Sequence, residues 1–261
     1  MTDTLHTRGR FTPGTFRPAP KRASASAMIA AQGKAETVLF LRHGEQQLLS
    51  VIIPLAALIL TARMPVISEQ TSLAQLFPMV LAIATSSSGF TGQAIAVAFD
   101  RRYGALKRTG ASGVPTSTII FGKVIAVAAM AALQILLLGA VALLLGWRAS
   151  PGGVVLGLVI LLIGITTFTA LGMLMGGTMS SEMVLALANL IWFLLVGAVG
   201  WVMFAHSLDN AGWYTAIPTV ALAAGLTDAF TGVIPWVEIA VLAGWAAIAS
   251  ALAVKWFRFE A

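Results

Sequence analysis

Apolar residues along this chain come in blocks of about twenty, separated by short polar segments. A helix of that length matches the thickness of the hydrocarbon core of a bilayer. We therefore predict an all-α membrane protein with six transmembrane helices, near residues 48–64, 73–98, 123–146, 154–175, 183–205 and 233–254. In such a chain the length sets the number of helices and not the number of soluble domains.

Two further stretches with apolar residues lie outside these spans. Residues 26–47 mix apolar and charged positions, which is typical of an amphipathic helix on the membrane interface. A loose linker into the first span would also fit, and Gly33 and Gly44 weaken the helix prediction. Residues 217–226 are too few to cross a bilayer, so we expect a short re-entrant or interfacial segment before the sixth span.

The second predicted span is unusually polar in its middle. Hydroxyl groups in a membrane helix bond back to their own helix or to neighbouring helices, so this stretch should face protein or a cavity and not lipid. The polar positions are Thr85, Ser86, Ser87, Ser88, Thr91 and Gln93. We take Ser87, Ser88 and Gln93 as candidates for a transport pathway or for helix packing.

The composition agrees with this interpretation. Hydrophobic residues make up 58% of the chain and charged residues only 10%, against roughly 45–50% and 25% in soluble domains. Residues 1–25 contain no apolar run, and we expect a disordered basic cytoplasmic tail there and no cleaved signal peptide. A transmembrane domain over residues 26–257 and a cytoplasmic tail at 258–261 complete the predicted organisation.

The positive charges predict the orientation. If the N-terminus is cytoplasmic, seven basic residues precede the first span, five lie between the second and third, and two follow the sixth. These make fourteen of the 16 Lys and Arg, and leave only Arg63 and Arg148 outside. Basic residues favour the cytoplasmic side, so both termini are predicted to lie there. The net charge of +6 then reflects topology, and we expect no nucleic-acid partner.

The residues offer little for catalysis. The three histidines, His6, His43 and His206, lie in different predicted segments and cannot easily meet. Ser88 with His206 superficially resembles an intramembrane serine protease, but the expected glycine-x-serine-glycine is missing. Without cysteine, thiolate catalysis and most zinc sites are excluded. We predict no catalytic residue, no metal site and no enzyme activity in this chain.

A few polar or small residues fall near or within the spans. Glu182 and Glu238 lie close to span ends, where solvation explains them better than transport does. Asn189 is deeper and is predicted to make an interhelical hydrogen bond. The small-residue spacing Gly172-x-x-x-Gly176 permits close packing within the bundle or with a second copy of the chain.

The loop between the second and third spans is the most distinctive segment. Residues 100–108 are charged and could form two helical turns, which Gly110 and Gly113 would end. Pro115 and the pair Gly122-Lys123 then lead into the third span. On physical grounds alone, a loop that merely fixes the topology explains the charges equally well.

In this loop the chain resembles the ABC-2 family of ABC transporter permeases, particularly the bacterial drug-export branch that includes the daunorubicin permease. The resemblance extends over about residues 26–257 and implies that the loop is the coupling helix that docks on an ATPase subunit. The residues concerned are Asp100, Arg101, Arg102, Tyr103, Gly104, Ala105, Leu106, Lys107 and Arg108.

The resemblance implies a permease subunit of an ATP-driven exporter in the bacterial plasma membrane, moving a hydrophobic or amphipathic compound. The chain has no phosphate-binding loop of the form G-x-x-x-x-G-K-[ST]. It should therefore bind no cofactor itself, and a separate ATPase would use ATP and Mg²⁺. Membrane lipid and a second permease subunit, identical or related, are the other expected partners.

Three rival interpretations remain open at this point. A secondary carrier or channel would transport without nucleotide, a scaffold would transport nothing, and an intramembrane enzyme would depend on Ser88 or His206.

Overall fold

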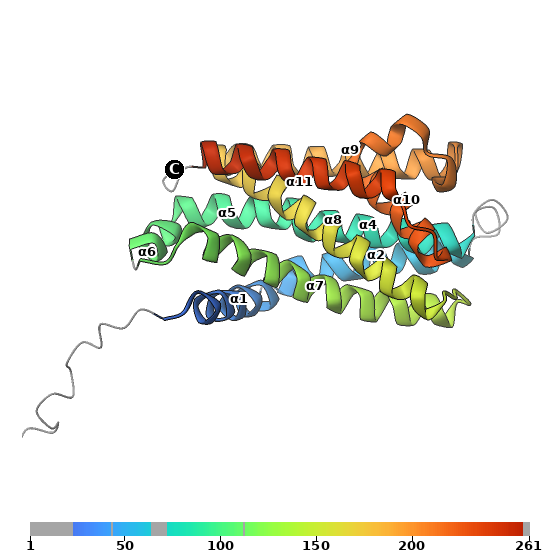
Figure 1. Ribbon diagram of the computed structural model, residues 1–261, viewed down its shortest axis with the longest axis horizontal. Helices are drawn as coiled ribbons and strands as arrows, with labels where there is room; N and C mark the ends of the chain where they lie inside the picture. The colour runs from blue at the N-terminus through green and yellow to red at the C-terminus, as the bar shows by residue number, and fades with distance from the viewer. Residues whose placement is uncertain (1–22, 43, 64–71, 112, 258–261) are drawn as a thin grey trace, which may run out of the picture.

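The computed structural model describes residues 23–42, 44–63, 72–111 and 113–257, and all regular structure in these ranges is helical, as predicted (Figure 1). The elements in chain order are α1 (Ala25–Arg42), α2 (Gly44–Arg63), α4 (Leu73–Ser86), the π-helical turn η1 (Ser87–Gly92), α5 (Gln93–Arg102), α6 (Ala105–Ala111), α7 (Thr116–Leu144), α8 (Pro151–Thr178), α9 (Ser181–Ala205), the 3-10 turns η2 (Leu208–Asn210) and η3 (Gly212–Ala216), α10 (Pro218–Thr231) and α11 (Trp236–Trp256).

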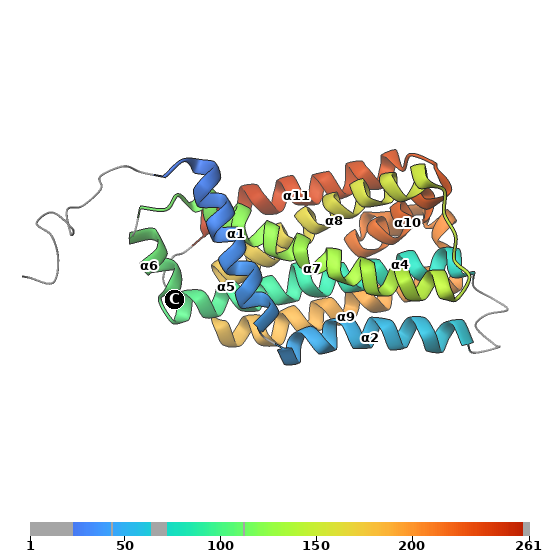
Figure 2. The ribbon, with the colours of Figure 1, turned by 90° about the horizontal axis from the view of Figure 1, so that it is seen from below.

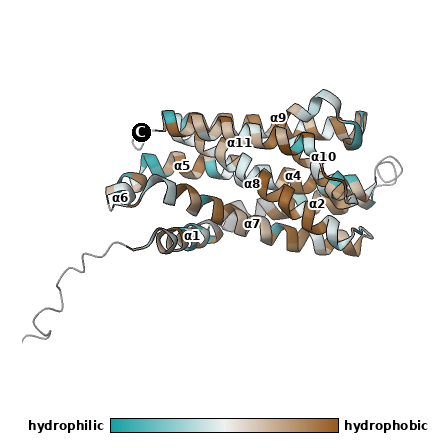
Figure 3. Ribbon diagram, viewed as in Figure 1, coloured by the Kyte–Doolittle hydropathy of each residue, from teal (hydrophilic) through white to brown (hydrophobic). Residues whose placement is uncertain are grey.

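Five helices in the described part of the chain are long and apolar enough to cross a membrane. They are the continuous helix Leu73–Arg102, which comprises α4, η1 and α5, and the helices α7, α8, α9 and α11. The first predicted span corresponds to α2, whose apolar part, Val51–Arg63, is shorter. Apolar positions fill the middle of the bundle, while hydrophilic positions gather toward its ends (Figure 3).

The helix boundaries differ from the predicted ones in two places. The third span begins at Thr116 and not near Lys123, because Pro115 adopts an extended backbone and forms the N-terminal cap. The interfacial segment ends at Arg42, and α2 begins at Gly44, earlier than the predicted start of the first span. Most of the predicted tail at 1–25 and all of 258–261 lie outside the described residues.

Helix α8 is the centre of the bundle. It packs against α5, α10 and α11, and its glycines allow this close approach. A Cβ atom at Gly172 would lie 2.6 Å from the carbonyl oxygen of Phe90, and one at Gly176 would lie 2.4 Å from that of Ala94. The Gly172-x-x-x-Gly176 spacing therefore packs α8 on the η1–α5 segment of the same chain.

The bundle has two ends, which we name the α6 end and the α10 end. At the α6 end lie α1, α6 and the C-terminal part of α11 (Figure 1). Helix α1 crosses the bundle obliquely over α7 (Figure 2), as expected for an interfacial helix. Gly33 and Gly122 make this crossing close: a Cβ at Gly122 would lie 2.5 Å from Cγ of Gln32, and one at Gly33 2.9 Å from Cγ2 of Ile125.

The chain between α9 and α11 enters the bundle and returns to the same end. Thr219, near the start of α10, donates a hydrogen bond to the carbonyl of Leu195, well inside α9. Phe230, near the end of α10, meets Gly153 at the start of α8. Helix α10 is almost wholly buried, and its short length and its path agree with the predicted re-entrant segment.

Candidate functional site

The helix of the second span continues to Arg102 and then bends sharply. Gly104 has a φ of 68°, a conformation that favours glycine, and the short helix α6 follows. The prediction of one continuous helix over residues 100–108 is therefore wrong, because Tyr103 and Gly104 form a turn within it. Residues 100–102 belong to the long helix of the second span, and residues 105–108 belong to α6.

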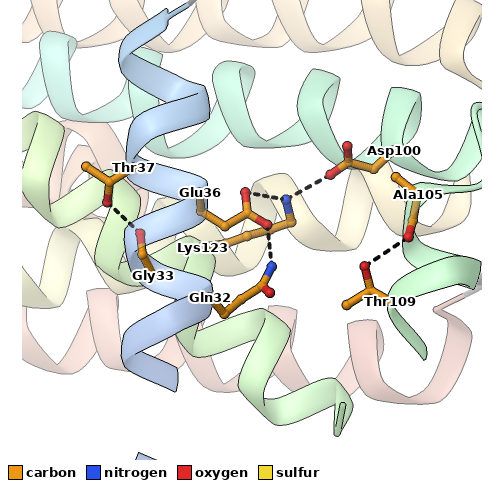
Figure 4. Close-up of polar contacts among 8 residues, drawn as sticks. All are labelled: Gln32, Gly33, Glu36, Thr37, Asp100, Ala105, Thr109 and Lys123. Atoms are coloured by element: carbon orange, nitrogen blue, oxygen red, sulfur yellow. Dashed lines mark hydrogen bonds and ion pairs between the residues drawn. The ribbon is translucent and has the colours of Figure 1, made fainter. Parts of the chain in front are cut away.

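Three side chains meet where α1, α5 and α7 come together (Figure 4). The Lys123 ammonium lies 3.0 Å from Oδ2 of Asp100 and 3.1 Å from Oε2 of Glu36. Gln32 donates a hydrogen bond of 3.0 Å to the other oxygen of Glu36. Lys123 thus joins the interfacial helix to the end of the second span.

Lys123 is 1% exposed, whereas the side chains of Glu36 and Asp100 keep 18% and 35% of their surface in contact with the surroundings. Burying a lone ammonium costs several kcal/mol, and two carboxylates within hydrogen-bond distance offset that cost. Removal of either carboxylate would leave the ammonium less well compensated. Lys123, which the sequence analysis counted among the cytoplasmic charges, is therefore also the centre of a buried ion-pair group.

Arg101 binds carbonyl groups at the C-terminal end of α8. It is 5% exposed, and its Nη1 donates hydrogen bonds to the carbonyl oxygens of Gly176 (2.9 Å) and Met179 (2.8 Å). The last carbonyl groups of a helix have no partners within the helix and carry partial negative charge. A buried guanidinium at this position satisfies them, so Arg101 fixes the end of the second span to the end of the fourth.

Arg102 binds the beginning of α9. Its guanidinium donates to the hydroxyl of Ser181 and to the carboxylate of Glu182, both in the first turn of that helix. The Glu182 side chain is 67% exposed and that of Arg102 48%, so the pair is solvated and contributes little to stability. The sequence placed Glu182 at a solvated helix end, and it lies there, with Arg102 as its partner.

Helix α6 has a buried side and an exposed side. Leu106 is 4% exposed and packs with Val97 of α5, Ile119 of α7 and Met173 of α8 in a small apolar cluster. Lys107 and Arg108 are exposed on the other side, and the ring of Tyr103 beside them is 66% exposed. Arg108 also donates to the carbonyl of Tyr103, which closes the turn before α6.

Three consecutive residues at the end of the second span therefore contact three different helices. Asp100 reaches α7 through Lys123, Arg101 reaches α8 and Arg102 reaches α9. Leu106 adds an apolar contact between α6 and two of these helices, α7 and α8. We name this group, Glu36, Asp100, Arg101, Arg102, Leu106 and Lys123, the junction. The junction therefore joins the end of the second span to α1, α7, α8 and α9.

The polar middle of the second span is buried, as the sequence predicts. Ser88 donates a hydrogen bond to the carbonyl of Ala84 in its own helix, and Gln93 is 2% exposed. The helix forms a π-helical turn over Ser87–Gly92, where Gly89 packs against Phe168 of α8. Such turns occur often at functional sites, although this one is filled by protein.

The remaining candidates lie apart from the junction. Asn189 is exposed and donates to the carbonyl of Leu185 in its own helix, so the predicted interhelical bond is wrong within this chain. Glu238 is half-buried at the α10 end, against Gly225. His206 stacks near Tyr214, with ring centroids 5.3 Å apart, at the end of α9 and far along the bundle from Ser88. Ser88 and His206, the pair considered from the sequence, are therefore not brought together.

The α10 end carries one perturbed acid. Asp228 lies near the end of α10, outside the long spans. Its burial raises the pKa of its carboxyl above the ordinary value, and the negative charges of Glu238 and Asp209 raise it further. In the part of the chain that the structure describes, no cluster of three or more histidine or acidic residues could hold a metal ion.

Comparison with known families decides the assignment. Residues 23–255 match the profile described as "ABC-2 family transporter protein". The chain belongs to the ABC-2 transporter family. Comparisons with curated proteins and with solved structures gave no match.

An ABC-2 permease is the membrane component of an ABC transporter, and the match covers every described span. ABC-2 permeases generally work with ATPase subunits. The matched range begins at residue 23 and so includes α1, which carries Glu36. The sequence analysis missed Glu36 and the burial of Lys123. A lone lysine next to an apolar run was a signal that Lys123 needs a carboxylate partner, although it does not identify Glu36.

Proposed function

We propose that this chain is the permease subunit of an ATP-driven exporter, and that a separate ATPase binds the exposed side of α6. Two permease subunits, identical or related, would enclose the pathway, and the cargo would be a hydrophobic or amphipathic compound such as an antibiotic, drug or lipid. With α6 on the cytoplasmic side, the C-terminal end of α2 and the connection between α7 and α8 lie at the opposite end (Figure 2). These segments carry Arg63 and Arg148, which agrees with the distribution of basic residues. A bacterial plasma membrane is the expected location.

The observation that carries the proposal is the two-sided character of α6. Its exposed side presents Lys107 and Arg108, with Tyr103 next to them. Aromatic and arginine side chains are enriched where proteins bind one another. Its buried side holds Leu106 against three spans, so a partner on the outside would be connected mechanically to the inside.

Coupling would then follow from the junction. Movement of the ATPase on ATP binding would displace α6 together with the end of the second span. Because Arg101 and Arg102 bind the adjoining ends of α8 and α9, these two helices would move with it. Packed interfaces tend to have discrete alternative arrangements, so the displacement would change access to the pathway in a stepwise manner.

The test is charge reversal on the exposed side of α6. The double variant Lys107→Glu/Arg108→Glu should strongly reduce the amount of ATPase that co-purifies with the tagged permease after gentle detergent extraction. Arg102 is left intact because it binds Glu182. Lys255→Glu, at the same end but on α11, is the matched control and should leave co-purification unchanged.

Two results would contradict the proposal. One is ATPase recovery equal to wild type from the double variant, provided that the variant elutes as a single species. The other is transport in proteoliposomes that contain the permease alone and no nucleotide, which would favour a secondary carrier or channel. Absence of any nucleotide-dependent transport, both in cells and in proteoliposomes that contain the permease, the ATPase and ATP, would favour a scaffold.

A further inference from the structure

One apolar groove among the described residues lies at the α10 end, between the parts of α7 and α8 that meet there. Its volume is about 410 Å³, within the range of small-molecule sites. Phe77, Trp147 and Phe230 line its inner wall, and their rings pack together with centroids 4.6 to 5.8 Å apart. The inner wall is therefore aromatic and almost free of polar groups.

The groove opens to the side of the bundle. Leu136, Leu143 and Leu158 line it, and they are 70%, 48% and 44% exposed. Gly139 also lines it, and a Cβ there would meet only Cζ of Phe77, at 3.8 Å. The absence of a side chain at Gly139 thus keeps part of the groove open. An apolar groove that opens to the side of a membrane-spanning bundle has the surface chemistry to take an acyl chain.

A positively charged guanidinium group, that of Arg148, lies at the mouth of the groove. Arg148 is exposed in the connection between α7 and α8, and its Nη1 donates hydrogen bonds of 2.7 Å to the carbonyl oxygens of Leu143 and Trp147. These bonds hold the guanidinium over the end of α7. Among the described residues no carboxylate pairs with Arg148, so its charge is available to an anion at the level of the lipid headgroups.

We propose that this groove is a binding site for an anionic phospholipid. The acyl chain would lie along the aromatic wall past Gly139, and the phosphate would bind the guanidinium of Arg148. Charge complementarity at the mouth distinguishes this occupant from a zwitterionic lipid or a neutral compound. The site does not depend on the ATPase, so it can be tested in the permease alone.

The experiment titrates full-length permease, purified and stripped of lipid in detergent, with phosphatidylglycerol or with phosphatidylcholine of identical acyl chains. Native mass spectrometry measures bound lipid, and the shift of the thermal unfolding midpoint measures its effect. Wild type should bind phosphatidylglycerol more tightly. Arg148→Gln should bind phosphatidylglycerol about fivefold more weakly, the usual effect of one basic residue near a membrane surface, and bind phosphatidylcholine as wild type does.

A second pair of variants tests the apolar part. Gly139→Leu and Ala140→Leu should each fill the groove and reduce the binding of both lipids. Arg63→Gln, the other basic residue at this end, and Gly197→Leu, where a Cβ would meet nothing within 4 Å, are the matched controls and should bind as wild type does.

The proposal is overturned if wild type binds the two lipids equally, if Arg148→Gln keeps the preference, or if both filling variants bind lipid as wild type does. A change of oligomeric state in the filling variants, without a change in lipid binding, would instead assign the groove to a second copy of the chain. None of these results affects the docking of an ATPase on α6.

Discussion

The two ends of this ABC-2 permease are held together by different interactions. At the α6 end, Asp100, Arg101 and Arg102 make directional hydrogen bonds and ion pairs with three other helices. At the α10 end, aromatic rings pack around Phe77 and Trp147, and the groove beside them is apolar.

The difference has a physical consequence. A buried ion pair is lost almost completely when one partner is removed, whereas an apolar contact weakens gradually with the volume that is lost. The α6 end is therefore suited to transmit a discrete displacement. The α10 end is suited to adapt to what lies against it. The following predictions test this contrast, from the largest expected effect to the smallest.

Lys123→Met should lower the free energy of unfolding by about 3 kcal/mol, because it keeps the volume but leaves Glu36 and Asp100 facing each other without a cation. Reversible unfolding in mixed micelles measures the change. Adding Glu36→Gln and Asp100→Asn to this variant should recover part of the loss. Lys34→Met, on the exposed part of α1, is the control. If this control lowered the free energy of unfolding as much as Lys123→Met does, the loss would not be specific to the buried ion pairs, and the contrast between the two ends would not hold.

Gly172→Leu should cost about 2 kcal/mol by overpacking, since a Cβ there lies 2.6 Å from the carbonyl oxygen of Phe90. This contact joins α8 to the second span between the two ends. The unfolding midpoint measures the effect against Gly197→Leu, which faces open space. Equal midpoints for the two variants would show that close packing at this crossing is not required.

Phe77→Leu should cost less than about 1.5 kcal/mol, even though Phe77 is 2% exposed and lies at the centre of the α10 end. The replacement stays apolar, and the neighbouring rings can move into part of the space. The same unfolding assay applies. If this variant proved as damaging as Lys123→Met, the α10 end would be no more adaptable than the α6 end.

Asp228→Asn should make stability less dependent on pH. The pKa of Asp228 is raised in the folded protein, chiefly by burial, so the folded state holds its proton more firmly than the unfolded state does. The contribution of Asp228 to the free energy of unfolding is fully present below the ordinary pKa of aspartate, and it is lost as the pH rises through the raised pKa of Asp228. The variant should unfold at a higher temperature than wild type at neutral pH, and at the same temperature below the ordinary pKa. A midpoint unchanged at neutral pH would contradict this.

Segment lengths and residue types predicted much of the architecture. The apolar blocks anticipated the long helices, the short stretch before the last span proved to be α10, and the hydroxyl residues of the second span are buried. These features depend on local periodicity and on the cost of exposing polar groups to lipid.

The junction could not be predicted in the same way, because its contacts join residues far apart in sequence. Lys123 and Glu36 are 87 positions apart, and no pattern along the chain indicates that α1 crosses α7 beside Asp100. The prediction of an interhelical hydrogen bond for Asn189 was wrong for a related reason. Its depth in the helix was predictable, but the direction in which it faces depends on how α9 packs. The turn at Gly104 was not predicted, because the charged residues around it are compatible with a continuous helix.

The central claim is that α6 faces the ATPase, and site-specific crosslinking tests it most directly. The chain has no cysteine of its own, so Gly110→Cys, on α6, can carry a photoactivated crosslinker without background. The control is Gly152→Cys at the opposite end; at both glycines a Cβ would meet nothing within 4 Å. In membranes of the native host, the account predicts an adduct between permease and ATPase from Gly110→Cys and none from Gly152→Cys. An adduct from Gly152→Cys alone, or equal yields from both positions, would contradict it.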